Sequence, residues 1–346
     1  MFVNSDGFYT AVLKSNFWAS GAGVGNVLDF ENKFNKYVSS DHCIAVNNGT
    51  AALHLALSLV DIKNMEVILP SLSFVSTAHA VIYNGGKPVF VDVEPDTLCI
   101  SAKTIKKSIT KKSRVVLPVH FGGMPCNLDE ISDLCREHDM ILIEDAAHAA
   151  GTTYHGQKIG SHGMAVCFSF HPVKNLAMPT GGAITLNGKK SDEYENILKS
   201  RRWCGISDRK GAVYDVKDIG WNFYMNEFSA AIGIEQLKKL DRTNLKRKET
   251  ARRYSKEMEL EKKMPFSNEC SYHLFWIQVK NRNEFMKKMN ENDIETGIHY
   301  APIHKMSFYK GKSLLPNTEQ ASKNIVSIPI HPNLGEDDVD KIIQLT

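Results

Sequence analysis

The sequence lacks the patterns that mark several common classes of protein. No stretch approaches the roughly 18 consecutive apolar residues of a membrane-spanning helix, and residues 1–15 do not combine a basic segment, an apolar run and a cleavage site. The 42 Lys and Arg nearly balance the 39 Asp and Glu, so no strong positive charge indicates nucleic acid. We therefore expect a cytoplasmic protein with no membrane span and no nucleic-acid partner.

Disulfide and metal patterns are also missing. The seven cysteines are scattered without a Cys-x-x-Cys pair, and several lie in apolar stretches, which favours buried, reduced thiols. The 13 histidines form no His-Glu-x-x-His motif and no Cys/His group with the spacing of metal ligands. The sequence therefore predicts no metal site.

What the chain does have is length and a clear periodicity. Its 346 residues with 42% apolar content are enough for two packed domains. From about residue 41 to 187, short β-branched apolar runs alternate with helical patterns, which is typical of an α/β fold with a mostly parallel sheet. We expect strands at 43–46, 66–69, 88–91, 114–119, 140–144, 165–170 and 183–186, and helices at 50–60, 76–84 and 128–138. One long helix from 227 to about 258 should follow, and then a strand, helix, loop and strand within 272–346, with a polar helix start at 335–338.

Two segments place polar side chains at the ends of predicted strands. In the first, a strand runs through a Gly-containing turn into an Ala-rich helix, whose free N–H groups and Thr50 hydroxyl suit a phosphate. Thr50 is equally suited to capping that helix. In the second, an apolar strand ends in Glu144 and Asp145, at the edge where open α/β sheets bind ligands. A carboxylate there can hold a protonated pyridine nitrogen, although an acid at a strand end is also a common turn residue.

A third segment adds a candidate reactive amine. Lys174 lies in a loop just past the predicted strand at 165–170, and Gly181 and Gly182 follow it. Such an amine can form an imine, and burial beside a cationic cofactor would lower its pKa, because desolvation and a like charge both disfavour the ammonium form. A single lysine is more often a solvated surface residue. The order of the three segments is what favours a pyridoxal-phosphate (PLP) site.

Together these segments resemble the DegT/DnrJ/EryC1/StrS family of sugar aminotransferases. The matching pieces are 18–21 with 30–31, 48–53, 70–77, 144–149, 168–175, 220–223 with 230–233, 299–304 and 328–332. The resemblance spans nearly the whole chain and implies the PLP-dependent transferase fold of the aspartate-aminotransferase type (fold type I). It implies a large, mostly parallel α/β domain over 1–235, then a linking helix and a small C-terminal α+β domain over 236–346.

The resemblance also implies a role for individual residues. Lys174 would carry PLP as a Schiff base and move the proton during the reaction, and Asp145 would pair with the pyridine nitrogen. The other implied cofactor contacts are Gly49, Thr50, Ala51, Phe74, His148, Ser169 and Asn222. Of these, Asn222 is implied to reach the phosphate of the neighbouring subunit, so the resemblance implies a homodimer with shared active sites. Trp18, His299 and Tyr300 are candidates for the sugar site.

The implied reaction is a ping-pong transfer of an amino group. Glutamate would convert PLP to the pyridoxamine form (PMP), and a keto sugar would then take the nitrogen. The expected acceptor is a nucleotide-linked deoxy sugar with a ketone at carbon 3 or 4, for amino sugars of cell-surface polysaccharides or secondary metabolites. The residues do not specify the sugar, its carrier or the aminated carbon, because fold does not fix substrate.

Three features depart from the family pattern. Tyr224 stands where many members have Arg or Lys, the loop at 177–180 differs from the usual Thr-Gly-Glu-Gly, and the stretch before Trp18 is short. These departures leave open the contacts that the basic residue and the usual loop would make.

Three alternatives remain. A PLP-dependent sugar dehydratase would carry His in place of Lys174. A catalytically idle or regulatory relative would keep the cofactor pocket without turnover. A nicotinamide oxidoreductase is suggested only by the glycines of 21–25, which lack a preceding strand and the G-x-G-x-x-G spacing.

Overall fold

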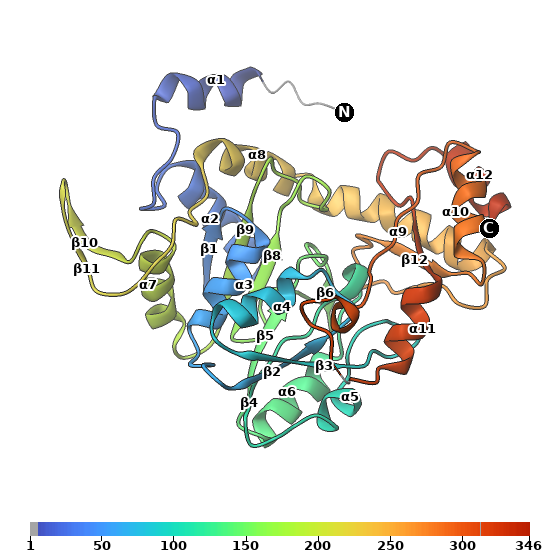
Figure 1. Cartoon of the computed structure of the whole chain (residues 1–346). Coiled ribbons are helices and arrows are strands. Elements are labelled where there is room, and N and C mark those ends of the chain that lie inside the picture. The colour runs from blue at the N-terminus through green and yellow to red at the C-terminus, as the bar shows by residue number, and fades with distance from the viewer. Residues whose placement is uncertain (1–5, 312) are drawn as a thin grey trace.

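The computed structural model describes residues 6–346, apart from residue 312, and is built around a seven-stranded sheet (Figure 1). In spatial order the strands are β1 (His42–Val46), β9 (Gly182–Leu186), β8 (Ala165–Ser169), β5 (Ile141–Asp145), β4 (Ser113–Val116), β2 (Glu66–Pro70) and β3 (Lys87–Val91). β9 pairs antiparallel with both of its neighbours, and the other four pairings are parallel. The predicted α/β architecture and its seven strands are confirmed. The strand predicted at 114–119 ends earlier because Pro118 has no N–H group to continue the ladder.

Both faces of the sheet are covered, as the apolar strands require. Alternate residues of β1 point to opposite sides: Cys43 and Ala45 join one buried cluster, Ile44 and Val46 the other. The cluster on one side includes residues of α2, and the cluster on the other side includes residues of α3. The helices of this part of the chain are α1 (Asp6–Ser15), α2 (Asn26–Val38), α3 (Gly49–Ser58), α4 (Ser76–Tyr83), α5 (Ala102–Lys106), the 3-10 turn η1 (Phe121–Gly123), α6 (Leu128–Glu137) and α7 (Ser191–Arg201).

The long helix predicted from 227 to about 258 is wrong, because the chain forms two helices there. α8 (Glu227–Leu237) ends before α9 (Leu240–Glu257) begins, with Lys238 and Lys239 between them. Neither lysine is a helix-breaking residue, so the local sequence carries no signal for the interruption. The two helices have different packing partners, α8 lying against α2 and α9 against α12 (Glu336–Leu345). Tertiary packing therefore decides this break.

The C-terminal elements surround a two-stranded antiparallel sheet of β12 (Phe275–Gln278) and β13 (Ile325–Ile328). Besides α12 they include α10 (Arg282–Asn290), the 3-10 turn η2 (Ile303–Lys305) and α11 (Pro316–Asn324). The sequence did not predict α11, which has a proline in its first turn, where the missing N–H costs nothing. One buried cluster runs from Phe34 of α2 to Trp276 of β12. The division into 1–235 and 236–346 therefore stays a prediction.

Two small hairpins complete the fold, β6 (Thr153–Tyr154) with β7 (Gln157–Lys158), and β10 (Ile206–Lys210) with β11 (Val213–Val216). The β10–β11 hairpin projects away from the sheet, on the side opposite the C-terminal elements (Figure 1). All seven cysteines are free, but Cys204 is exposed, which corrects the prediction that every thiol is buried. Within the described ranges, no helix combines the length and the apolarity that a membrane crossing requires.

Candidate active site

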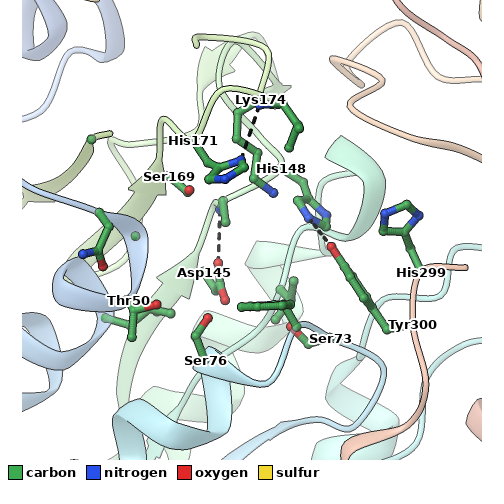
Figure 2. Close-up of a pocket in the computed structure, with 18 of the residues that line it drawn as sticks. Thr50, Ser73, Ser76, Asp145, His148, Ser169, His171, Lys174, His299 and Tyr300 are labelled. Carbon is green, nitrogen blue, oxygen red and sulfur yellow. Dashed lines mark hydrogen bonds between the residues drawn. The ribbon is translucent and has the colours of Figure 1, made fainter. Parts of the chain in front are cut away.

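A cavity of about 420 Å³ opens at the carboxyl ends of β5 and β8. This is the edge at which parallel α/β sheets bind ligands, and the volume suits a small cofactor. Figure 2 shows Thr50 and Ser169 on one side and His148, His299 and Tyr300 on the other, with Lys174 and Asp145 between them. Nine of the residues predicted for the site line this cavity: Gly49, Thr50, Phe74, Asp145, His148, Ser169, Lys174, His299 and Tyr300. The fold thus brings together side chains from both halves of the sequence.

Asp145 lies at the end of β5 with its carboxylate held by two donors. Thr77 Oγ1 donates to Oδ2 at 2.8 Å, and the Ala147 N–H donates to Oδ1 at 3.1 Å. Burial raises the pKa of Asp145, while both hydrogen bonds and the charge of Lys174 oppose this rise. The carboxylate therefore has a fixed orientation in the pocket and suits a cationic N–H partner.

Removing the Thr77 hydroxyl should weaken the grip of this carboxylate on a cationic ring. The Thr77→Val variant loses a hydrogen bond to a charged group, worth about 1.5–3 kcal/mol, so the pKa of Asp145 should rise. We expect the variant to bind PLP about 10-fold more weakly than the wild type at pH 7. The difference should grow at lower pH, because Asp145 takes up a proton at a higher pH in the variant than in the wild type. Titration of PLP followed by absorbance measures this. Thr77→Ser keeps the donor and should bind like the wild type; equal loss in both variants would contradict the role of the hydroxyl.

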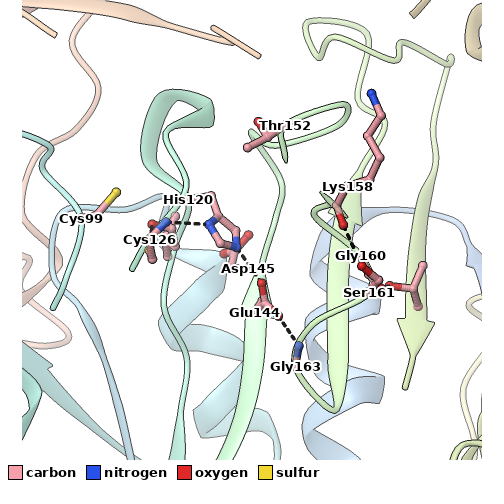
Figure 3. A network of polar contacts seen from close by, with 12 residues as sticks. Cys99, His120, Cys126, Glu144, Asp145, Thr152, Lys158, Gly160, Ser161 and Gly163 are labelled. Carbon is pink, nitrogen blue, oxygen red and sulfur yellow. Dashed lines mark hydrogen bonds and ion pairs between the residues drawn. The ribbon is translucent and has the colours of Figure 1, made fainter. Parts of the chain in front are cut away.

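Glu144, the other acid at this strand end, does not line the pocket, and Figure 3 shows it between His120 and Gly163. Its Oε2 lies 2.8 Å from His120 Nε2, and its Oε1 accepts the Gly163 N–H. Because His120 Nδ1 accepts the Cys126 N–H at 3.1 Å, the ring proton belongs on Nε2 and faces Glu144. Adjacent strand residues face opposite sides, so only Asp145 can serve the pocket. Glu144 therefore has a structural role and links the segments that carry His120 and Gly163.

The turn before α3 supplies backbone donors. Asn48 caps the helix, its Oδ1 accepting the Ala51 N–H at 2.8 Å, so Thr50 is not the capping residue. The N–H groups of Gly49 and Thr50 have no hydrogen-bond partner among the described residues. A Cβ on Gly49 would stand 2.7 Å from Ser169 Cβ, so only glycine allows the turn to approach β8 this closely. The N–H groups of Gly49 and Thr50, together with the hydroxyls of Thr50 and Ser169, suit a phosphate.

Lys174 follows β8 in a turn closed by its own N–H, which donates to the His171 carbonyl at 2.8 Å. Its Nζ lies 3.3 Å from His273 Nε2. Burial lowers the pKa of Lys174 to about 8, although the charge of Asp145 opposes this shift. A larger fraction of unprotonated amine at neutral pH is what an imine-forming lysine requires.

The opposite wall is polar and largely buried. His148 Nδ1 accepts the Gly122 N–H at 3.2 Å, so its Nε2 carries the proton and faces the Tyr300 hydroxyl at 3.1 Å. His299 Nδ1 lies 2.9 Å from Ser327 Oγ. Burial lowers the pKa of His148 well below its usual value and lowers that of His299 as well. This wall therefore presents neutral imidazoles and a hydroxyl, which suit a hydroxyl-rich ligand.

Phe74 lines the pocket with a ring that is 58% exposed and lies 6.2 Å from the Tyr300 ring. Such a ring is available for stacking on a ligand.

Three predicted site residues do not line the cavity of their own chain. Ala51 is buried, Trp18 is half exposed and near Phe228, and Asn222 uses its carbonyl to accept from Asn47 Nδ2 at 3.4 Å.

Sequence reasoning missed two residues, one of which contacts Asp145 and the other Lys174. Thr77 lay within the matching segment 70–77, but nothing in its spacing linked it to Asp145. His273 lies just before β12, almost a hundred residues from Lys174, where a single histidine in an apolar stretch indicates no ligand. Only the tertiary contact reveals either role.

The sequence profile of the DegT/DnrJ/EryC1/StrS aminotransferase family matches residues 5–345. The chain belongs to this family. It is 34% identical to the spore coat polysaccharide biosynthesis protein SpsC of Bacillus subtilis, covering 97% of this chain and 91% of SpsC.

Solved structures of similar proteins agree with this assignment. DesV from S. venezuelae is 30% identical with a TM-score of 0.91, covering 99% of this chain and 93% of DesV. The aminotransferase PseC from Helicobacter pylori is 25% identical with a TM-score of 0.93, covering 100% of this chain and 95% of PseC. The predicted fold and the predicted enzyme class are confirmed: the chain is a PLP-dependent sugar aminotransferase.

The residues of the cavity fit PLP. Gly49 lets the α3 turn approach β8 closely, so the N–H groups of Gly49 and Thr50 and the Ser169 hydroxyl line the same part of the cavity. Asp145 offers a buried carboxylate, and Lys174 offers an amine with a lowered pKa. A phosphate, a pyridine nitrogen and an aldehyde therefore each find a complementary group in one pocket.

Proposed function

We propose that this aminotransferase moves an amino group from glutamate to a nucleotide-linked deoxy sugar with a ketone at carbon 3 or 4. The observation that carries the proposal is the placement of the Lys174 amine and the Asp145 carboxylate in one cavity with neutral polar groups on its far wall. SpsC is named for spore coat polysaccharide biosynthesis, and PseC for the biosynthesis of pseudoaminic acid. The enzyme would work in the cytoplasm, and its amino sugar would be used for cell-surface polysaccharides or secondary metabolites.

The cavity residues divide between holding the cofactor and moving a proton. Gly49, Thr50 and Ser169 would bind the phosphate, and Asp145 would pair with the pyridine nitrogen. PLP, when bound, supplies an electron sink for the carbon that carries the nitrogen. The Lys174 amine would act as general base and then as general acid at that carbon, and its pKa of about 8 suits both directions near neutral pH.

The far wall would orient the sugar. The Tyr300 hydroxyl, held at 3.1 Å by His148 Nε2, and the His299 imidazole face the same cavity as Lys174. Neutral donors and acceptors suit sugar hydroxyls better than charged groups would, because they fix orientation without requiring an opposite charge on the ligand. His148 would also lie near the phenolic oxygen of the cofactor, and Phe74 would stack on its ring.

A homodimer is part of the proposal. Trp18 and Asn222 lie outside the cavity of their own chain, and the β10–β11 hairpin projects with exposed Val213 and Val216 side chains. A second copy that packs against the β10–β11 hairpin would bury Val213 and Val216, and each Asn222 would then lie near the phosphate of the other subunit. Sedimentation with and without PLP measures the oligomeric state.

The reaction is tested by separating its two halves. Glutamate should bleach the visible absorption of the PLP-loaded enzyme and release 2-oxoglutarate without any sugar, and a nucleotide-linked keto sugar should then restore the absorption and yield the amino sugar. Nucleotide sugars that lack the ketone are the control. Bleaching by glutamate with no acceptor among 3- and 4-keto sugars would reject the proposed acceptor. No bleaching by any amino donor would favour the catalytically idle relative.

A further inference from the structure

His273 is the closest polar partner of the Lys174 amine among the described residues. Its Nε2 lies 3.3 Å from Lys174 Nζ, and the side chain is 8% exposed. Its ring lies 4.5 Å from the ring of His148, centroid to centroid, and its buried Nδ1 has no hydrogen-bond partner in the part of the chain that the structure describes. A buried imidazole with one nitrogen unpaired and the other aimed at a reactive amine requires an explanation.

We propose that His273 is a positioning residue that accepts a hydrogen bond from the Lys174 amine and holds that amine in place whenever it is not covalently engaged. The inference rests on the proposed role of Lys174, but it concerns a contact that this chain makes by itself. Lysine has a flexible four-carbon stem, so an unheld amine would sample many rotamers. Fixing the amine keeps it within reach of the reacting carbon in both halves of the reaction.

The direction of the hydrogen bond follows from the groups around the ring. An ammonium group has three donors and no acceptor, so Nε2 of His273 must carry the lone pair and Nδ1 the proton. Burial lowers the pKa of His273 well below its usual value, and the positive charges of Lys174 and Arg247 act in the same sense. The imidazole therefore stays neutral and available as an acceptor.

The charged groups that face Lys174 decide what the contact does to its protonation. Burial lowers the pKa of the amine to about 8, and the charge of Asp145 opposes this shift. A neutral acceptor stabilises the ammonium form relative to the free amine. His148 does not replace this acceptor, because its Nδ1 accepts the Gly122 N–H and its Nε2 carries the proton. Loss of the His273 acceptor should therefore lower the pKa of Lys174 further.

A matched pair of variants tests the contact. His273→Gln keeps an acceptor and His273→Met removes it, at nearly the same side-chain volume. In the cofactor-free chain, the pH dependence of Lys174 modification by an amine-selective reagent, read by mass spectrometry, gives its pKa. We expect His273→Met to lower that pKa by about one unit, since the ammonium form loses a hydrogen bond that the neutral amine needs less, and His273→Gln to stay near the wild type.

The control is His162→Met, which removes a half-buried histidine outside the pocket whose buried Nδ1, like that of His273, has no hydrogen-bond partner among the described residues. It should leave the pKa of Lys174 unchanged. His273→Phe keeps the ring beside His148 without the nitrogen and replaces the Met variant if that chain does not fold. With PLP and glutamate, loss of the acceptor should lower the single-turnover rate constant at saturating glutamate about 10-fold, with little change in the glutamate concentration that gives half of that rate, because positioning acts on the chemical step.

Equal pKa values for Lys174 in the wild type and in the folded variants would overturn the proposal and leave His273 as a packing residue. The measurement uses the cofactor-free chain, so a failure to aminate keto sugars would not alter its result. A shifted pKa in an enzyme with no sugar acceptor would support the contact and reject only the proposed acceptor.

Discussion

Replacing Lys174 with alanine is expected to lower the rate constant of the half-reaction with glutamate by at least about 10³-fold. General acid–base catalysis alone contributes about 10²–10⁴-fold, and the variant also loses the amine that binds the cofactor covalently. Lys174 is the lysine in the cavity, with its pKa lowered to about 8. Single-turnover release of 2-oxoglutarate from glutamate, at saturating PLP, measures the loss without requiring the sugar acceptor.

Two control variants distinguish loss of the reactive amine from loss of a positive charge and from a general effect of removing a lysine. Lys174→Arg keeps a positive charge but remains protonated, so it should be as inactive as the alanine variant. Lys111→Ala removes an exposed lysine outside the cavity and should retain full activity. A Lys174→Ala enzyme that kept more than about a tenth of the wild-type rate would contradict the assigned role.

Replacing Glu31 with alanine should destabilise the protein by about 3–5 kcal/mol. Glu31 is 3% exposed, and its Oε1 accepts from Arg202 Nη1 and, at 2.8 Å, from the Ala45 N–H. Arg202 is fully buried, and its Nε and Nη2 have no partner within the described part of the chain. Loss of the carboxylate would leave an uncompensated guanidinium in the core beside β1, which costs far more than losing an exposed ion pair.

Urea unfolding followed by circular dichroism measures this difference. Asp29→Ala is the matched control, since it removes an exposed partner of Lys33 one turn away on the same helix and should cost less than about 1 kcal/mol. The double variant Glu31→Met with Arg202→Met should recover much of the loss, because both buried charges are then gone. Equal costs for Glu31→Ala and Asp29→Ala would show that the buried pair contributes no special stability.

Much of the fold could be predicted because the strands are buried on both faces. The apolar runs at β1, β5 and β8 have the length and β-branched composition of parallel-sheet strands, and their turns contain Gly, Asn or Ser. The helix break at Lys238 was invisible because neither packing partner of α8 or α9 is adjacent in the sequence. The β10–β11 hairpin was also missed, since its strands are exposed and lack the buried alternating pattern.

The residues themselves indicated the family and the cofactor, through motifs that resemble those of the family, and predicted that Lys174 and Asp145 serve one site. Tertiary structure alone showed that Thr77 contacts Asp145 and that His273 contacts Lys174. Such contacts join segments far apart in sequence. Their geometry depends on how the sheet and the C-terminal elements pack, which no local pattern encodes.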